Sequence, residues 1–183
     1  MVTRSACDVV THFELFNLAP TVDLDVKALE DLHRKLSLES HPDRLPAGAE
    51  ARERRLAAER SAALNEAVKV LRDPVRRAFY VLELKGVKLD TEQAAAKVKM
   101  PMDFLEEIME RREALEAAKA ARKLELAQAM AKEIREANGQ SLRLAQDALR
   151  KDDVATATVA LGRVRYYSRF LEEVDAFEEE LLS

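Results

Sequence analysis

The chain contains few residues that interrupt helices, since its 183 residues include only 4 glycines, 5 prolines and no tryptophan. Alanine, leucine, glutamate, arginine and lysine dominate, and no run of alternating β-branched residues bounded by turn signals occurs. This composition predicts an all-α fold of one or two small domains. No apolar stretch approaches the length of about 18 residues that suggests a membrane span, and the first residues do not resemble a secretion or organelle signal. We therefore expect no membrane partner.

Residues with site chemistry are equally scarce. Cys7 is the single cysteine, which excludes an internal disulfide and indicates a reducing compartment. The three histidines form no Cys/His set with metal-ligand spacing, and there is no Gly-Lys phosphate loop, so we expect no metal or other cofactor. Acids and bases balance over the first 90 residues, and the net charge of −4 comes from the second half, which disfavours nucleic acid.

The most informative motif is His41-Pro42-Asp43, which separates a predicted helix ending near Ser40 from another beginning near Ala49. Apolar residues recur at helical spacing on both sides of it: Leu29, Leu32 and Leu36 before, and Leu64, Ala67, Val68 and Leu71 after. Asp23 and Asp25 are candidate N-caps of the first helix. Two such helices joined by a short polar loop should form an antiparallel pair, with the loop exposed at one end.

Pro42 fixes its own φ and disfavours a helical conformation at His41, which stiffens the loop and presents Asp43. An exposed carboxylate on a stiff loop can accept a bidentate arginine from a partner, so we interpret the motif as a docking element. Two other interpretations remain: a plain turn, and an acid–base pair of His41 and Asp43. We find no nucleophile, metal cluster or second carboxylate placed to work with that pair, so the sequence predicts that the chain is not an enzyme.

Helical periodicity lapses between Gly86 and Met100, which predicts domains at 1–85 and 101–183 with a linker at 86–100. Pro74 starts a helix that runs to about Lys85, where Gly86 suits a C-terminal cap, and Pro101 suits the first turn of the next helix. Three further helices are expected, near 102–118, 122–150 and 154–182, with Asp153 as an N-cap. Short connections between them predict a three-helix bundle.

Both halves resemble one known family. The first half is similar to J-domains in His41-Pro42-Asp43, in the segment from Leu64 to Pro74, and in Arg76-Arg77-Ala78-Phe79-Tyr80. The whole chain resembles the HscB (Hsc20) family, the J-domain co-chaperones of iron–sulfur cluster assembly. The segments that carry this closer resemblance are Phe13-Glu14-Leu15-Phe16, Leu24-Asp25, Leu29-Glu30, Ser61-Ala62-Ala63-Leu64-Asn65 and the segment from Asp103 to Glu116.

The resemblance implies two partners and a surface for each. An Hsp70-type chaperone of the HscA kind, with its ATPase stimulated, would be bound by His41, Pro42, Asp43, Arg34, Lys35 and Arg44. An iron–sulfur scaffold protein of the IscU kind would be bound by Leu105, Glu106, Met109, Glu110, Glu113 and Tyr166. From the residues alone, Leu105 and Met109 also suit an ordinary core and the glutamates a solvated helix face. An adaptor for a different client and a purely structural helical protein remain as alternatives.

Some positions depart from the family pattern. Glu106 stands where an apolar residue is common, and Glu30 and Glu39 stand where bases are common, so the basic side of the helix before the loop is thin. His33 occupies a position where J-domains commonly have tyrosine, and we expect it to be a partly buried packing residue. The zinc-binding cysteine pairs of some eukaryotic members are missing, which favours a bacterial-type cytoplasmic form.

Overall fold

The structure is a computed structural model that describes residues 10–40, 46, 48, 50–89 and 98–182. Every regular element within these residues is a helix, which confirms the predicted all-α class. The chain divides into two compact units, Met1–Tyr80 and Val81–Ser183, and each is described by itself. The functional boundaries expected near residues 85 and 100 stay predictions.

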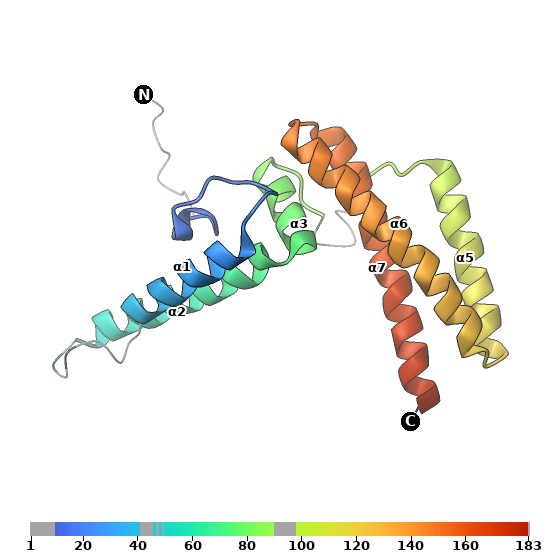
Figure 1. Ribbon diagram of the computed structural model, residues 1–183, viewed down its shortest axis with the longest axis horizontal. Coiled ribbons are helices and arrows are strands. Elements are labelled where there is room, and N and C mark those ends of the chain that lie inside the picture. The colour runs from blue at the N-terminus through green and yellow to red at the C-terminus, as the bar shows by residue number, and fades with distance from the viewer. Residues whose placement is uncertain (1–9, 41–45, 47, 49, 90–97, 183) are drawn as a thin grey trace. The chain divides into compact units, whose positions relative to one another are not determined.

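The first unit is built on an antiparallel helix pair, α1 (Val26–Glu39) and α2 (Ala51–Arg72), which lie side by side in Figure 1. Asp25 is the N-cap of α1 and accepts a hydrogen bond from the backbone N–H of Ala28 at 3.1 Å, so the second of the two cap candidates is the correct one. The predicted apolar stripe of α2 is confirmed because all four of its residues are buried: Leu64, Ala67, Val68 and Leu71.

A short 3-10 helix, η1 (Glu14–Phe16), covers part of this pair. Phe13 and Phe16 are almost fully buried, and the ring of Phe16 lies 6.4 Å from that of His33. The backbone N–H of His12 donates to the hydroxyl of Tyr80 at 2.9 Å. These contacts connect the N-terminal segment to the helices of the first unit.

Helix α3 (Pro74–Leu84) follows α2 after the single residue Asp73. The Asp73 side chain accepts hydrogen bonds from the backbone N–H groups of Val75 and Arg76, at 2.8 and 2.9 Å, and so caps the new helix. Beyond its end, Gly86 has a φ of +90°, and its N–H donates to the carbonyl of Glu83. This left-handed conformation confirms Gly86 as the predicted C-terminal cap.

The second unit contains α5 (Met102–Ala120), α6 (Leu124–Arg150) and α7 (Val154–Leu182), which agree with the three predicted ranges to within about two residues. Asp153 is the expected cap of α7, because its carboxylate accepts from the N–H of Thr156 at 3.0 Å. Pro101 is the N-cap residue of α5 and lies just before its first turn, so its predicted place was wrong by one position.

The three helices of the second unit pack as the predicted bundle (Figure 1). Its core combines aromatic and aliphatic side chains from all three: Phe104, Ile108 and Leu115 from α5, Ala127, Ala131 and Ile134 from α6, and Tyr167, Phe170, Val174 and Phe177 from α7. The small residues of α6 permit a close approach of the larger rings on its neighbours. Among the described residues, no helix is long and apolar enough to cross a membrane.

Candidate partner-binding surfaces

Four of the predicted Hsp70-binding residues, His41, Pro42, Asp43 and Arg44, lie outside the described residues. The structure places the other two, Arg34 and Lys35, on the exposed surface of α1. Arg34 forms a 3.3 Å ion pair with Asp31, one turn earlier. Because both side chains of that pair are largely exposed, the pair contributes little to stability and leaves Arg34 accessible to a partner.

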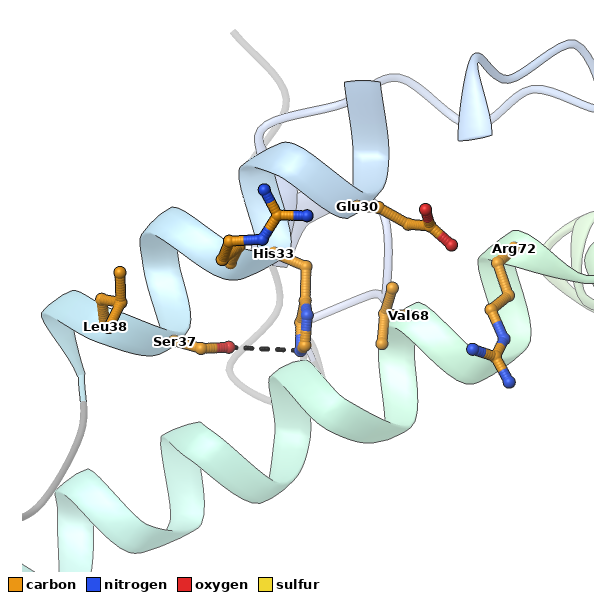
Figure 2. Close-up of a pocket in the computed structure, with 7 residues that line it drawn as sticks. Glu30, His33, Ser37, Leu38, Val68 and Arg72 are labelled. Carbon is orange, nitrogen blue, oxygen red and sulfur yellow. Dashed lines mark hydrogen bonds between the residues drawn. The ribbon is translucent and has the colours of Figure 1, made fainter. Parts of the chain in front are cut away.

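An open groove of about 430 Å³ lies between α1 and α2, next to the end of α1 that leads to the tripeptide (Figure 2). Its lining combines acid, base and apolar groups: Glu30, His33, Arg34, Ser37, Leu38, Val68 and Arg72. Leu38 is 60% exposed at this groove. The mixture of charges agrees with the thin basic character that the sequence predicts for α1.

His33 ties the two helices together at the centre of the groove. Its Nε2 lies 2.9 Å from Oδ1 of Asn65 on α2 and 3.2 Å from Oγ of Ser37 on α1, the second of which is drawn in Figure 2. The side chain is partly buried, as its place in the sequence predicts, but it contributes hydrogen bonds as well as packing. His33 therefore holds the α1 surface against α2.

Four of the five predicted scaffold-binding residues of α5 are exposed, and the fifth, Leu105, is partly buried. Met109 is 61% exposed, and Glu106, Glu110 and Glu113 are exposed around it. Leu105 is partly buried and packs against the bundle core. The core interpretation is therefore correct in part for Leu105 and wrong for Met109, which leaves an apolar side chain in solvent on a well-formed helix.

Tyr166 joins this surface from α7. Its ring meets that of Phe104 edge-to-face with centroids 5.6 Å apart, and the buried ring of Tyr167 meets Phe104 at the same distance. Tyr166 itself is partly buried beside the core, as its position next to Tyr167 predicts. Phe104 thus connects Tyr166 with the first turns of α5, where Leu105 lies.

Charges on α5 are distributed by side. Glu106, Glu110 and Glu113 point to solvent and form no ion pair with any described residue. Two of its arginines reach neighbouring helices: Arg111 donates to Glu107 on α5 and to Glu133 on α6, and Arg112 pairs with Glu173 on α7. The accessible face of α5 is therefore both apolar and negatively charged.

Burial works to lower the pKa of the Arg111 guanidinium, but its hydrogen bonds to Glu133 and Glu107 outweigh burial and raise that pKa. Arg111 is consequently a permanent cation within the bundle.

Sequence reasoning missed Arg111 and Arg112 as contact residues. The available signal was the adjacency of two arginines on a helix with many glutamates, but that pattern does not reveal which neighbours they reach.

Comparison with known proteins agrees with this arrangement. Residues 100–175 match the family model described as the HSCB C-terminal oligomerisation domain. A co-chaperone protein HscB homologue of Burkholderia vietnamiensis is 34% identical over 171 residues, which cover 93% of this chain and 95% of that protein. The chain belongs to the HscB co-chaperone family. A second HscB homologue, from Aeromonas salmonicida, is 33% identical over 94% of this chain and 98% of its own length.

Solved HscB structures share the fold. The chaperone HscB from Vibrio cholerae superposes with a TM-score of 0.75 at 29% identity, covering 93% of this chain and 99% of that one. The human co-chaperone HscB superposes with a TM-score of 0.77 over 96% of this chain and 84% of its own, and at 22% identity it supports the fold alone. The predicted architecture, an N-terminal J-domain followed by a C-terminal helical bundle, is confirmed. Co-chaperones of this family form a non-enzymatic class.

No described residues form a cluster of three or more histidine, cysteine, aspartate or glutamate side chains that could hold a metal ion. The arrangement instead offers surfaces: a groove on the first unit and an apolar, acidic face on the second. Such surfaces can bind proteins.

Proposed function

We propose that this HscB-family protein binds an iron–sulfur cluster scaffold protein and delivers it to a dedicated Hsp70-type chaperone, whose ATP hydrolysis it stimulates. The observation that carries the proposal is the outer face of α5, where the exposed Met109 lies among carboxylates that have no partner in the described chain. A face of this kind is costly for an isolated protein and suits a partner with apolar and basic groups.

The scaffold protein would cover Leu105, Met109 and Tyr166 as the apolar centre of the interface. Glu106, Glu110 and Glu113 would surround that centre and attract basic side chains of the scaffold. Aromatic and apolar anchors generally supply most of the affinity, while charges at the rim set the association rate. We therefore expect the apolar residues to control the dissociation rate of the scaffold and the glutamates to control its association rate.

The chaperone would dock on the J-domain, with Asp43 as the main contact and His41 and Pro42 shaping the loop. Arg34, Lys35 and Arg44 would provide supporting positive charge. Arg34 and Lys35 support this role because both are exposed on α1, next to the groove that contains Leu38. The J-domain in this proposal performs no chemistry, since hydrolysis belongs to the chaperone.

Two binding surfaces on one chain raise the effective concentration of client at the chaperone. By thermodynamic linkage, any change in scaffold affinity caused by the chaperone must be matched by an equal change in chaperone affinity caused by the scaffold. The protein would act in the cytoplasm without a cofactor, a membrane or nucleic acid.

Calorimetric titration of the full-length protein into purified scaffold tests the client surface. We expect saturable binding that is lost in Leu105→Ala/Tyr166→Ala. The matched control is Leu144→Ala, because Leu144 is a partly exposed leucine on α6 outside the proposed surface, and its removal should leave affinity unchanged. Absence of binding by a folded wild-type protein would reject scaffold delivery.

Stimulation of the Hsp70 ATPase tests the other surface. Asp43→Asn should abolish nearly all stimulation while the helical content and unfolding midpoint remain those of the wild type. Asp147→Asn serves as the control, since Asp147 is an exposed aspartate of α6 in the second unit. Stimulation that survives Asp43→Asn contradicts the docking role of the tripeptide.

An adaptor for a different client is the second candidate, and it predicts ATPase stimulation without scaffold binding. A purely structural protein predicts neither. The two assays together therefore separate the three functions.

A further inference from the structure

Helix α5 carries two consecutive arginines that reach different neighbours. Arg111 donates from Nε to Glu107 and from Nη1 to Glu133 on α6, both at 3.0 Å. Arg112 places Nη2 3.2 Å from Oε1 of Glu173 on α7. Successive residues of an α-helix point about 100° apart, so adjacent positions can reach both flanking helices. The two arginines fasten α5 on two sides.

The Arg112 contact belongs to the same seam as the proposed client surface. Helices α5 and α7 run parallel, because α6 returns antiparallel between them in the chain (Figure 1). At one end of the seam Phe104 contacts Tyr166 and Tyr167. Arg112 lies about two turns beyond Leu105, and Glu173 lies about two turns beyond Tyr166. The ring contacts and the ion pair thus join the two helices at two separate points.

The contribution of Arg112 to the stability of the bundle is expected to be small. Its Nε is buried and has no hydrogen-bond partner, and an unmade bond of this kind is unfavourable. Its side chain is 39% exposed, and ion pairs at that exposure add little stability. An apolar side chain would seal the seam at least as well. What an ion pair can add is geometry, because it forms only where the two charged groups lie opposite each other.

We infer that the Arg112–Glu173 ion pair is a positioning element of the client surface. It fixes the register of α5 against α7 and so sets the spacing of Leu105 and Met109 from Tyr166. Arg112 is a positioning residue, since it acts through these three side chains and not by touching the client. The inference rests on the proposed function, because it assumes that the scaffold spans α5 and α7 at once.

The test compares Arg112→Gln with Arg111→Gln, the same substitution one residue earlier on the same helix. We expect Arg112→Gln to weaken scaffold binding about fivefold in calorimetry, and Arg111→Gln to change it by less than about twofold. The unfolding midpoint should fall more in Arg111→Gln than in Arg112→Gln. Arg111→Gln removes two hydrogen bonds, whereas Arg112→Gln also removes a buried N–H that has no partner.

A double-mutant cycle separates positioning from general loosening. Arg112 is proposed to act through the distance of Tyr166 from Leu105 and Met109. In a Tyr166→Ala background that distance no longer matters, so Arg112→Gln should reduce scaffold affinity by less than about twofold there. The charge exchange Arg112→Glu/Glu173→Arg should recover most of the wild-type affinity.

Several results would overturn the inference. One is wild-type affinity in Arg112→Gln, and another is an equal loss in the wild-type and Tyr166→Ala backgrounds. A third is a loss of scaffold affinity that is proportional to the fall in unfolding midpoint in both arginine variants. Arg112 would then affect binding only through the stability of the bundle. A wild-type protein that binds no scaffold overturns the proposed function and the inference together, whereas scaffold binding that is insensitive to Arg112→Gln overturns the inference alone.

Discussion

Arg77 offers the sharpest test of how the first unit is held together. Only 6% of the residue is exposed, and its guanidinium donates from Nε to the carbonyl of Val22 at 3.0 Å and from Nη1 to the carbonyl of Leu71. Val22 precedes α1, and Leu71 lies in the last turn of α2, where carbonyls have no partner within the helix. One side chain on α3 thus satisfies two carbonyls from separate segments.

The expected cost of Arg77→Ala follows from these bonds. Hydrogen bonds to charged groups contribute about 1.5–3 kcal/mol each, and a cation at a helix C-terminus adds a favourable interaction with the dipole. Desolvation opposes these gains, and it lowers the pKa of Arg77 despite the nearby Asp73 and Asp23. We expect a net loss of about 3 kcal/mol, which is roughly a hundredfold in the unfolding equilibrium.

Urea unfolding measures the loss, and hydrogen exchange of α2 and α3 peptides should locate it in the first unit. Arg77→Met is the decisive comparison, because methionine retains much of the apolar stem but leaves both carbonyls unpaired. If the bonds matter, Arg77→Met should be nearly as unstable as Arg77→Ala, whereas the exposed neighbour Arg76→Ala should cost less than about 0.5 kcal/mol. Wild-type stability in Arg77→Met would show that packing, and not hydrogen bonding, explains the buried arginine.

Three further perturbations test other parts of the structure. Asp153 has a lowered pKa because the Thr156 N–H and hydroxyl hydrogen-bond its carboxylate, so its stabilisation is present above the usual pKa of 3.8 and is lost as pH falls through the folded value. Asp153→Ala should therefore lower the unfolding midpoint by a few degrees at neutral pH, and the difference from wild type should close in acid. A Cβ on Gly162 would lie 2.8 Å from Sδ of Met100, near the far end of a flexible side chain that can move aside at little cost. Gly162→Ala should therefore gain most of the helix propensity of about 1 kcal/mol in urea unfolding, and a loss of stability that Met100→Ala reverses would show that Met100 is held in place. Glu106→Gln should slow scaffold association and reduce its dependence on salt in stopped-flow measurements, and an unchanged rate would exclude electrostatic steering by this carboxylate.

Much of the fold is predictable because local chemistry fixes it. The apolar stripe of α2, the caps at Asp25 and Asp153, and the left-handed Gly86 each depend on residues within one or two turns. The same locality explains the small error at Pro101, since proline is compatible with both the cap and the first turn.

The buried arginine and the two fastening arginines could not be predicted in this way. Arg77 reaches Val22, and Arg111 and Arg112 reach other helices, so their partners are distant in sequence. In the sequence these residues look like ordinary solvated charges. Their roles depend on which helix faces are brought together, and periodicity alone does not specify that.

The client surface shows a different limit. Apolar residues lie on more than one side of α5: Phe104 and Ile108 are buried, whereas Met102 and Met109 are exposed. A single amphipathic face therefore cannot be assigned from spacing. The resemblance to a known family, and not the periodicity, identified Leu105 and Met109 as surface candidates, and their roles in binding stay predictions.

The outer face of α5 is where the sequence departs most clearly from what stability alone would select. Met109 gains nothing from exposure, and like charges four residues apart, as in Glu106 and Glu110, destabilise a helix by a few tenths of a kcal/mol. The arginines that could neutralise these carboxylates are instead turned toward Glu133 and Glu173. Because Arg111 and Arg112 are engaged by carboxylates other than Glu106, Glu110 and Glu113, the acidic face remains available to a basic partner. The contacts of α5 with its neighbouring helices and the recognition proposed for its outer face would therefore depend on the same division of charge.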